Sequence, residues 1–222
     1  MINTFHLKMI ATLVMLVDHV AHYLLPTTHI LYIPMRILGR ISAPIFMYCF
    51  AMGFKHTRNR LAYQKRLALA SVGMCVLNII LSMLLCSRLS VFEPNMFLTF
   101  LVLSIIIECF EIGIKTKKLS MWIVGAVLCL IATYKVEYGI FAIFTVLVFY
   151  FINHELIRNT IYVIGSLILC VIKNNFIQVF MILSVLLIAF DNKQKPRLQY
   201  KNFFYWFYPI HIALLLIIQI LF

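Results

Sequence analysis

The sequence predicts an all-α protein, a polytopic bundle of transmembrane helices whose N-terminus is cytoplasmic. Of its 222 residues, 64% are hydrophobic and only 12% are charged, and its mean hydropathy is +1.02. A soluble domain is about 45–50% apolar and about 25% charged, so no soluble core could hide this much apolar surface. The apolar residues also form stretches close to the roughly 20 residues that a helix needs to cross a bilayer.

Nine stretches are candidate spans, and we expect between about eight and ten spans in all. The seventh stretch is short, and the count falls to eight if 160–190 forms one bent helix. No linker or low-complexity tract divides the chain, so we expect a single transmembrane domain over 1–222. The candidates run roughly over 6–25, 33–54, 67–86, 96–114, 119–134, 138–154, 160–173, 175–190 and 203–222.

The positive charges are distributed in a way that orients the chain. Runs of Lys and Arg at 55–66, 115–118 and 193–201 alternate with loops that hold at most one cation. By the positive-inside rule, this alternation places the N-terminus inside and the C-terminus outside the inner (cytoplasmic) membrane of the cell. Because orientation accounts for the net charge of +12, we expect a multi-pass protein in a lipid bilayer and no nucleic acid partner.

Ionisable residues interrupt three of these apolar stretches. Asp18 and His19 lie in the first, Arg36 and Arg40 open the second, and Tyr208–His211 opens the last. Such groups at membrane depth cost roughly 2.5–3.5 kcal/mol each on insertion scales and usually face a protein interior or a wet cavity. Counted along each span, the first two pairs fall in the outer half and the last segment in the inner half, which predicts two polar clusters.

These residue types have a common chemistry. A neutral imidazole at His19 can accept a proton, and Asp18 can orient a histidine or pair with Arg40. Arg36 and Arg40 lie four residues apart on one helical face, with Gly39 between them for close helix approach, and can grip a carboxylate or phosphate. The alternative is a structural Asp–Arg–His network that ties helices together.

Further candidates lie outside this group. The cationic run at His56, Arg58, Asn59 and Arg60 could clamp the phosphates of a cytosolic cofactor, or serve only as an orienting loop. Asn95 and Tyr138 are polar positions at the outer side of the bundle.

Two other groups of polar residues can be explained by purely structural roles. Tyr208 and His211 could line a substrate path, although aromatic residues at a helix start usually form an interfacial belt. Glu108 and Glu111 most simply form a salt bridge beside the basic loop 115–118.

Several enzyme classes lack their motifs here. The chain contains no HExxH, GxSxG or P-loop motif, which argues against zinc proteases, serine hydrolases of that type and ATP-driven transport. The six cysteines lie in apolar stretches without metal-ligand spacing, so we treat them as small hydrophobic residues and expect no metal.

Six segments, in order along nearly the whole chain, resemble the TraX family of membrane proteins. Each is weak alone, but together they are specific. Relative to the family, Glu137 stands where Asp is usual. The segments are KMIATLVMLVDH (Lys8–His19), RILGRISAPIF (Arg36–Phe46), GFKHTRNR (Gly53–Arg60), PNMFLT (Pro94–Thr99), Glu137–Gly139 and FYWFYPIHIALL (Phe204–Leu215).

This resemblance implies a membrane acetyltransferase related to the wider membrane acyltransferase group. The donor would be cytosolic acetyl-CoA, and the acceptor would be a peptide or pilin N-terminal amine, or the hydroxyl of a small molecule. His19 matches the family's DH position and would act as base or as transient acyl carrier. A homodimer is compatible with the sequence. The rival readings are a small transporter or immunity-type membrane protein that uses the same polar residues, and a purely structural membrane subunit.

Overall fold

The computed structural model of the protein describes residues 3–84, 95–192 and 201–221, and every element within these ranges is a helix. The basic run 193–200, Cys86 and Pro94 lie outside the described residues. The elements are α1 (Thr4–Leu24), α2 (Tyr32–Gly39), α3 (Ser42–Lys55), α4 (Arg60–Leu84), α5 (Met96–Thr116), α6 (Leu119–Lys135), α7 (Ile140–Phe151), α8 (Glu155–Ile172), η1 (Phe176–Leu183), α9 (Ser184–Ala189) and α10 (Lys201–Leu221).

The predicted all-α class is confirmed, and each predicted span coincides with a helical segment. Five helical stretches are long and apolar enough to cross a membrane, and the described part also holds four shorter apolar helices of 10–17 residues. The alternative of one bent helix over 160–190 is wrong. Helix α8 ends at Ile172, the chain turns back at 173–175, and η1 packs against α8.

The second predicted span is broken into α2 and α3 at Arg40 and Ile41. Pro44 has no backbone N–H, so the Arg40 carbonyl loses its usual partner four residues on. The backbone N–H groups of Arg40 and Ile41 instead donate to carbonyls three residues earlier, at 3.1 and 3.2 Å, which tightens the chain locally. This break sets Arg40 against α1.

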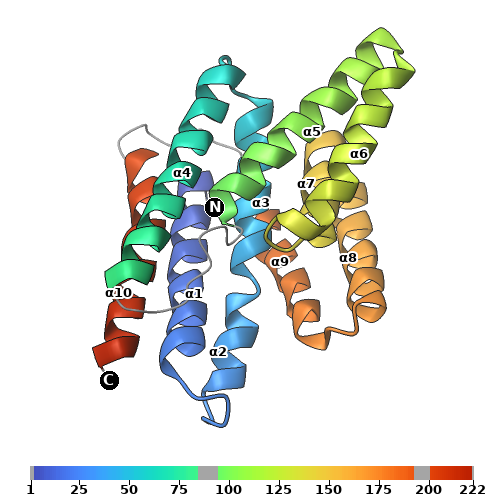
Figure 1. Ribbon diagram of the computed structural model, residues 1–222. Helices are drawn as coiled ribbons and strands as arrows, with labels where there is room; N and C mark the ends of the chain where they lie inside the picture. Colours follow the sequence, from blue (N-terminus) through green and yellow to red (C-terminus); the bar gives the residue numbers. More distant parts are fainter. Residues whose placement is uncertain (1–2, 85–94, 193–200, 222) are drawn as a thin grey trace.

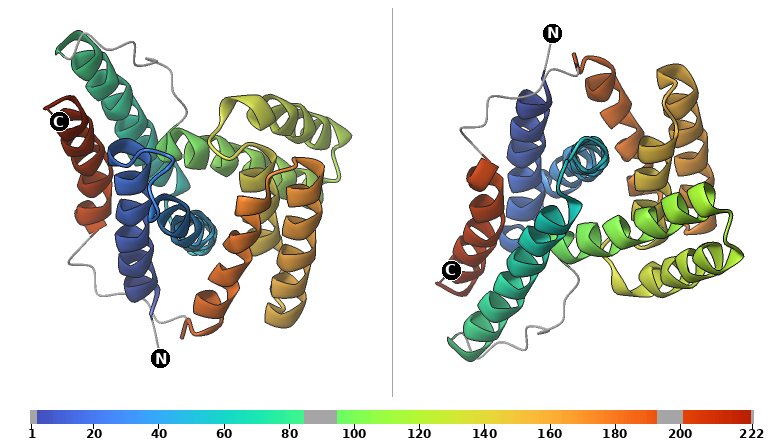
Figure 2. Two further views of the ribbon diagram at one scale, coloured as in Figure 1. Left: turned by 90° about the horizontal axis from the view of Figure 1, so that it is seen from below. Right: turned by 90° about the horizontal axis from the view of Figure 1, so that it is seen from above.

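Two helices organise the packing. Helix α3 contacts α1, α5, α7 and α9, and its side chains include the fully buried Met47, Tyr48 and Phe54. Helix α1 lies between α2, α3 and α10. Figures 1 and 2 show α1 and α10, from opposite ends of the sequence, side by side and running in the same direction.

The turns between helices lie at two ends of the molecule. In Figure 1 the α3–α4 and α5–α6 turns, which carry predicted basic loops, are at the top. The α1–α2 and α8–η1 turns are at the bottom. The helix order therefore keeps these basic turns together at one end, as the alternation of charge in the sequence requires.

Candidate functional site

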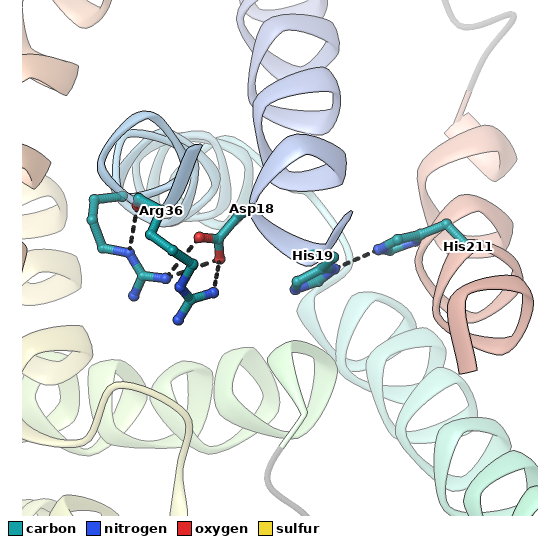
Figure 3. Close-up of polar contacts among 5 residues, drawn as sticks. Asp18, His19, Arg36 and His211 are labelled. Atoms are coloured by element: carbon teal, nitrogen blue, oxygen red, sulfur yellow. Dashed lines mark hydrogen bonds and ion pairs between the residues drawn. The ribbon is translucent and has the colours of Figure 1, made fainter. Parts of the chain in front are cut away.

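A buried carboxylate shared by two arginines forms the first part of the site. Asp18 of α1 is 7% exposed. Nη2 of Arg40 donates to both carboxylate oxygens at 2.9 Å, and Nη1 of Arg36 lies 3.0 Å from Oδ2. Nε of Arg40 also donates to the Arg36 carbonyl at 3.2 Å, which fixes the two arginines relative to each other (Figure 3). The predicted Asp18–Arg40 pair is therefore present, and Arg36 joins it.

Gly39 makes this arrangement possible. A Cβ at this position would overlap the Cβ and carboxylate of Asp18, so α2 comes against α1 only because residue 39 has no side chain. The prediction that Gly39 permits close helix approach is confirmed.

The second part of the site is a pair of histidines from α1 and α10. Nδ1 of His19 lies 2.7 Å from Nε2 of His211, and Nδ1 of His211 lies 2.7 Å from the Phe207 carbonyl. The two rings are within 8° of parallel and their centroids are 5.0 Å apart. His19 is thus hydrogen-bonded to His211 and not to its neighbour Asp18, and the two side chains leave α1 in different directions (Figure 3).

The expectation that Tyr208 and His211 belong to an inner polar cluster, apart from Asp18 and His19, is therefore wrong. His211 and Tyr208 belong with Asp18 and His19, not with a second group at the inner side. The position of a residue along its own helix predicts its depth in the membrane only if neighbouring helices are aligned. It does not fix how far α10 is shifted along α1.

A cavity of about 320 Å³ joins these groups. It brings together residues from α1, α2, α4, α10 and two turns, among them most of the predicted site residues. Its wall consists of Asp18, His19, His22, Tyr23, Arg36, Arg40, Met74, Asn78, Asn95, Glu137, Tyr138, Tyr208, Ile212 and Leu216. We call it the polar cavity.

Asn95 and Glu137 are held together on the wall of the polar cavity. The Thr99 hydroxyl donates to the Asn95 carbonyl at 3.1 Å and accepts from the Glu137 N–H at 3.0 Å. Among the buried side-chain atoms of the described residues, Asn95 Nδ2 and Glu137 Oε2 have no hydrogen-bond partner. One is a donor and the other an acceptor, so the pair is available to a bound molecule.

Glu137 was not among the site residues expected from the sequence, although its motif with Tyr138 and Gly139 was recognised. Tyr138 and Gly139 both have positive φ angles, of 62° and 48°, and this tight turn carries Glu137 to the cavity. Burial raises the pKa of Glu137 to about 7, against the opposing effect of Arg40. A carboxyl group that binds a proton near neutrality is a useful sign of a functional site.

A second cavity, of about 550 Å³, adjoins the polar cavity and shares Tyr208 with it. We call it the aromatic cavity because its lining is dominated by aromatic side chains of α1, α3, α4, α5 and α10. Its cationic residues are Lys8 and Arg66. Arg66 belongs to the basic run 55–66 of the sequence. Lys8 was missed as a candidate, yet it is a cation inside an apolar helix, which is the same signal that identified Asp18.

None of the four predicted residues at the α3–α4 turn, His56, Arg58, Asn59 and Arg60, lines either cavity, whereas Thr57 beside them lines the aromatic cavity. His56 and Arg58 are exposed. Asn59 caps α4, since its Oδ1 accepts from the Ala62 N–H at 2.9 Å. Arg60 is paired with a carboxylate of α5.

The expected salt bridge is confirmed for Glu111 but not for Glu108. Glu111 forms its salt bridge with Arg60 and also accepts from the Tyr150 hydroxyl at 2.6 Å. Glu108 accepts from the Gln64 amide at 2.9 Å. The partners lie on α4 and α7, which pack against α5.

The polar cavity has the parts of an acyl-transfer site. Two guanidinium groups face one Asp18 carboxylate, so this cluster keeps one net positive charge that could stabilise a developing oxyanion. His19 provides an imidazole on the same wall. Tyr208 lines both cavities and lies where they adjoin.

Comparison with protein families finds one match, to the TraX protein family, over residues 4–219. No curated protein matches the chain, and no solved structure matches it. The matched range includes α1 through to the last turns of α10, so it contains every residue of the two cavities. The chain belongs to the TraX family.

Proposed function

We propose that the protein is an acyltransferase of the inner membrane that moves an acetyl group from cytosolic acetyl-CoA to an amine or hydroxyl acceptor. One observation carries the proposal: His19 and the positively charged Asp18–Arg36–Arg40 cluster line a cavity that meets a second, aromatic cavity at Tyr208. Membership of the TraX family is consistent with this activity.

The donor would occupy the aromatic cavity. Acetyl-CoA has a long, weakly polar pantetheine arm that suits a wall of aromatic rings, and phosphates that suit cations. Lys8 and Arg66 lie in the second turns of α1 and α4, and α4 starts at the end of the bundle where the basic turns gather. We assign this end to the cytoplasm, and Arg58 on the adjacent turn would extend the phosphate site.

The acceptor would occupy the polar cavity. Asn95 Nδ2 can donate to it and Glu137 Oε2 can accept from it, since neither atom has another partner. Tyr138 and Tyr208 complete the wall beside them. A site built to hydrogen-bond its substrate rejects analogues that lack those groups more strongly than a purely apolar pocket does.

The reaction uses His19 as general base. As the acceptor nitrogen or oxygen forms its bond to the acetyl carbonyl carbon, its proton passes to Nε2 of His19, and the carbonyl oxygen becomes an oxyanion facing Arg36 and Arg40. The carbon–sulfur bond then breaks, and the CoA thiolate takes the proton back from His19. A transient acetyl group on Nε2 would use the same atom in two successive transfers.

The test is acetyl transfer by purified protein in detergent. Radiolabelled acetyl-CoA would be supplied with a free-amine peptide, an N-blocked peptide or a sugar, and both CoA release and labelled product would be measured. General-base help is worth about 10²–10⁴ in rate, so His19→Ala should lose at least that factor. His29→Gln, an exposed histidine in the α1–α2 turn, is the matched control and should retain full activity.

Two outcomes would overturn the proposal. His19→Ala protein that folds and still transfers acetyl at the wild-type rate would remove the histidine from the mechanism. Substrate movement across proteoliposomes without consumption of acetyl-CoA would identify a transporter instead.

A further inference from the structure

A chain of two hydrogen bonds runs from the backbone of α10 to the wall of the polar cavity. It begins at the Phe207 carbonyl, passes through the His211 ring, and ends at Nδ1 of His19, with 2.7 Å at each step. His211 is 5% exposed, and Phe207 stacks on its ring at a centroid distance of 4.8 Å. This ring therefore has little freedom to turn.

These two hydrogen bonds have a fixed direction, because the Phe207 carbonyl at their start can only accept a hydrogen bond. A backbone carbonyl has no hydrogen to donate, so Nδ1 of His211 must carry one. A neutral imidazole carries a single N–H, which leaves Nε2 of His211 as an acceptor. Nδ1 of His19 must then be the donor to it. A second proton on His211 would instead place a positive charge on a ring that is only 5% exposed.

We propose that His211 is a positioning residue that fixes His19 in its Nδ1–H tautomer and leaves Nε2 bare to receive the acceptor's proton. This deepens the proposed function and rests on it for its catalytic meaning. Asp18, the neighbouring carboxylate, does not serve this purpose, because its side chain leaves α1 in a different direction from His19 and binds Arg36 and Arg40 (Figure 3). The ring of α10 provides the orienting partner that a carboxylate provides in many base-assisted sites.

The arrangement also supports the charged state of His19. When Nε2 takes the acceptor's proton, the Nδ1–H bond to His211 becomes charge-assisted and about twice as strong. The proton leaves again from Nε2 to the CoA thiolate, so His211 neither gains nor loses a proton over the cycle. Its contribution is orientation and a stronger hydrogen bond in the transition state.

Kinetics of two His211 variants test this role, with acetyl-CoA and glycinamide as the probe acceptor. His211→Phe keeps a flat ring without an acceptor atom and should lower kcat roughly 10–100-fold, the usual cost of losing such an orienting partner. The KM for acetyl-CoA should change little. His211→Gln offers a carbonyl oxygen to Nδ1 of His19 and should recover most of kcat. Equal losses in both variants, or a change confined to KM, would overturn the proposal.

Nitrogen-15 NMR of histidine-labelled protein in micelles tests the tautomer without any need for transfer activity. The His19 signals, identified by their loss in His19→Ala, should show Nδ1 protonated and Nε2 bare, and His211→Phe should shift them toward a mixture of tautomers. A wild-type His19 protonated on Nε2 would refute the assignment. The expected tautomer in a protein that transfers no acetyl group would instead refute the proposed function alone.

Discussion

At Asp18, one carboxylate holds two guanidinium groups in place, and each contributes differently. Arg40 bonds both oxygens, while Arg36 reaches only one. A buried ion pair gains stability only when its geometry is good, and removal of one partner leaves an uncompensated charge. The geometry here depends on Gly39, because any side chain at that position would occupy the space of the carboxylate.

Gly39→Ala should therefore lower both thermal stability and acetyl transfer. The added methyl group must displace the Asp18 carboxylate or separate α2 from α1, and overpacking of this kind costs about 1–3 kcal/mol. The thermal midpoint in detergent, followed by circular dichroism, measures the first effect. Gly73→Ala is the matched control, since a Cβ there meets open space and Ala is favoured over Gly in a helix by about 0.8–1 kcal/mol. A Gly39→Ala protein as stable and active as Gly73→Ala would contradict this account.

At the scale of the element, the α3–α4 turn shows how residues of one motif differ in their contacts. Asn59 begins α4 as its cap, with 2.9 Å from Oδ1 to the Ala62 N–H. Arg60 is committed to Glu111 across the interface with α5. Arg58 precedes both and is exposed, and it follows Thr57, which lies on the wall of the aromatic cavity.

Asn59→Ala and Arg58→Ala should thus have opposite signatures. Loss of the cap at Asn59 costs about 0.5–2 kcal/mol, so its thermal midpoint falls, and Asn59→Ser should restore it. Arg58→Ala should leave the midpoint unchanged and weaken binding of radiolabelled acetyl-CoA in equilibrium dialysis. Weaker binding in Asn59→Ser but not in Arg58→Ala would reverse the division of roles.

At the scale of the whole molecule, the helices alternate in direction and keep the basic α3–α4 and α5–α6 turns at one end. A layout of this kind predicts which turns face the cytoplasm without any reference to the site. In the same layout α4, which carries Arg66, starts at the basic end, and the α1–α2 turn lies at the opposite end.

Cysteine labelling tests this orientation. Thr28→Cys in the α1–α2 turn should react with a membrane-impermeant maleimide in intact cells. Arg58→Cys in the α3–α4 turn should react only after permeabilisation, with the wild-type protein as the background for its native cysteines. Labelling of Arg58→Cys alone in intact cells would invert the orientation, and with it the proposed cytosolic entry for acetyl-CoA.

The helices themselves could be predicted from the sequence because apolar length and composition are properties of single segments. Each predicted span matches a helical segment, and even the short 160–173 stretch is part of α8. The break at Arg40 was open to prediction as well, since Pro44 removes a backbone donor. The residue at which α2 ends depends on packing against α1 and could not be read from the chain.

The site was only partly predictable because it depends on how helices shift along one another. The Asp18–Arg40 pair, Gly39 and His19 follow from spacing and from the cost of charge at membrane depth. The contact between His19 and His211 spans 192 positions, and nothing in either local sequence sets that register. The sequence also leaves Arg60 free to bind a phosphate, because its partner Glu111 comes from a different helix, α5.

The pairing of His19 with His211 also has a consequence for biosynthesis. The two rings come from the first and last helices, 192 residues apart, and chains are made at about 5–20 residues per second. For roughly 10–40 s after α1 leaves the ribosome, its imidazole has no partner from α10, and the aromatic cavity lacks one wall. Premature termination before α10 would leave an inserted but inert fragment, so the membrane would receive catalytic protein only from chains that had been completed.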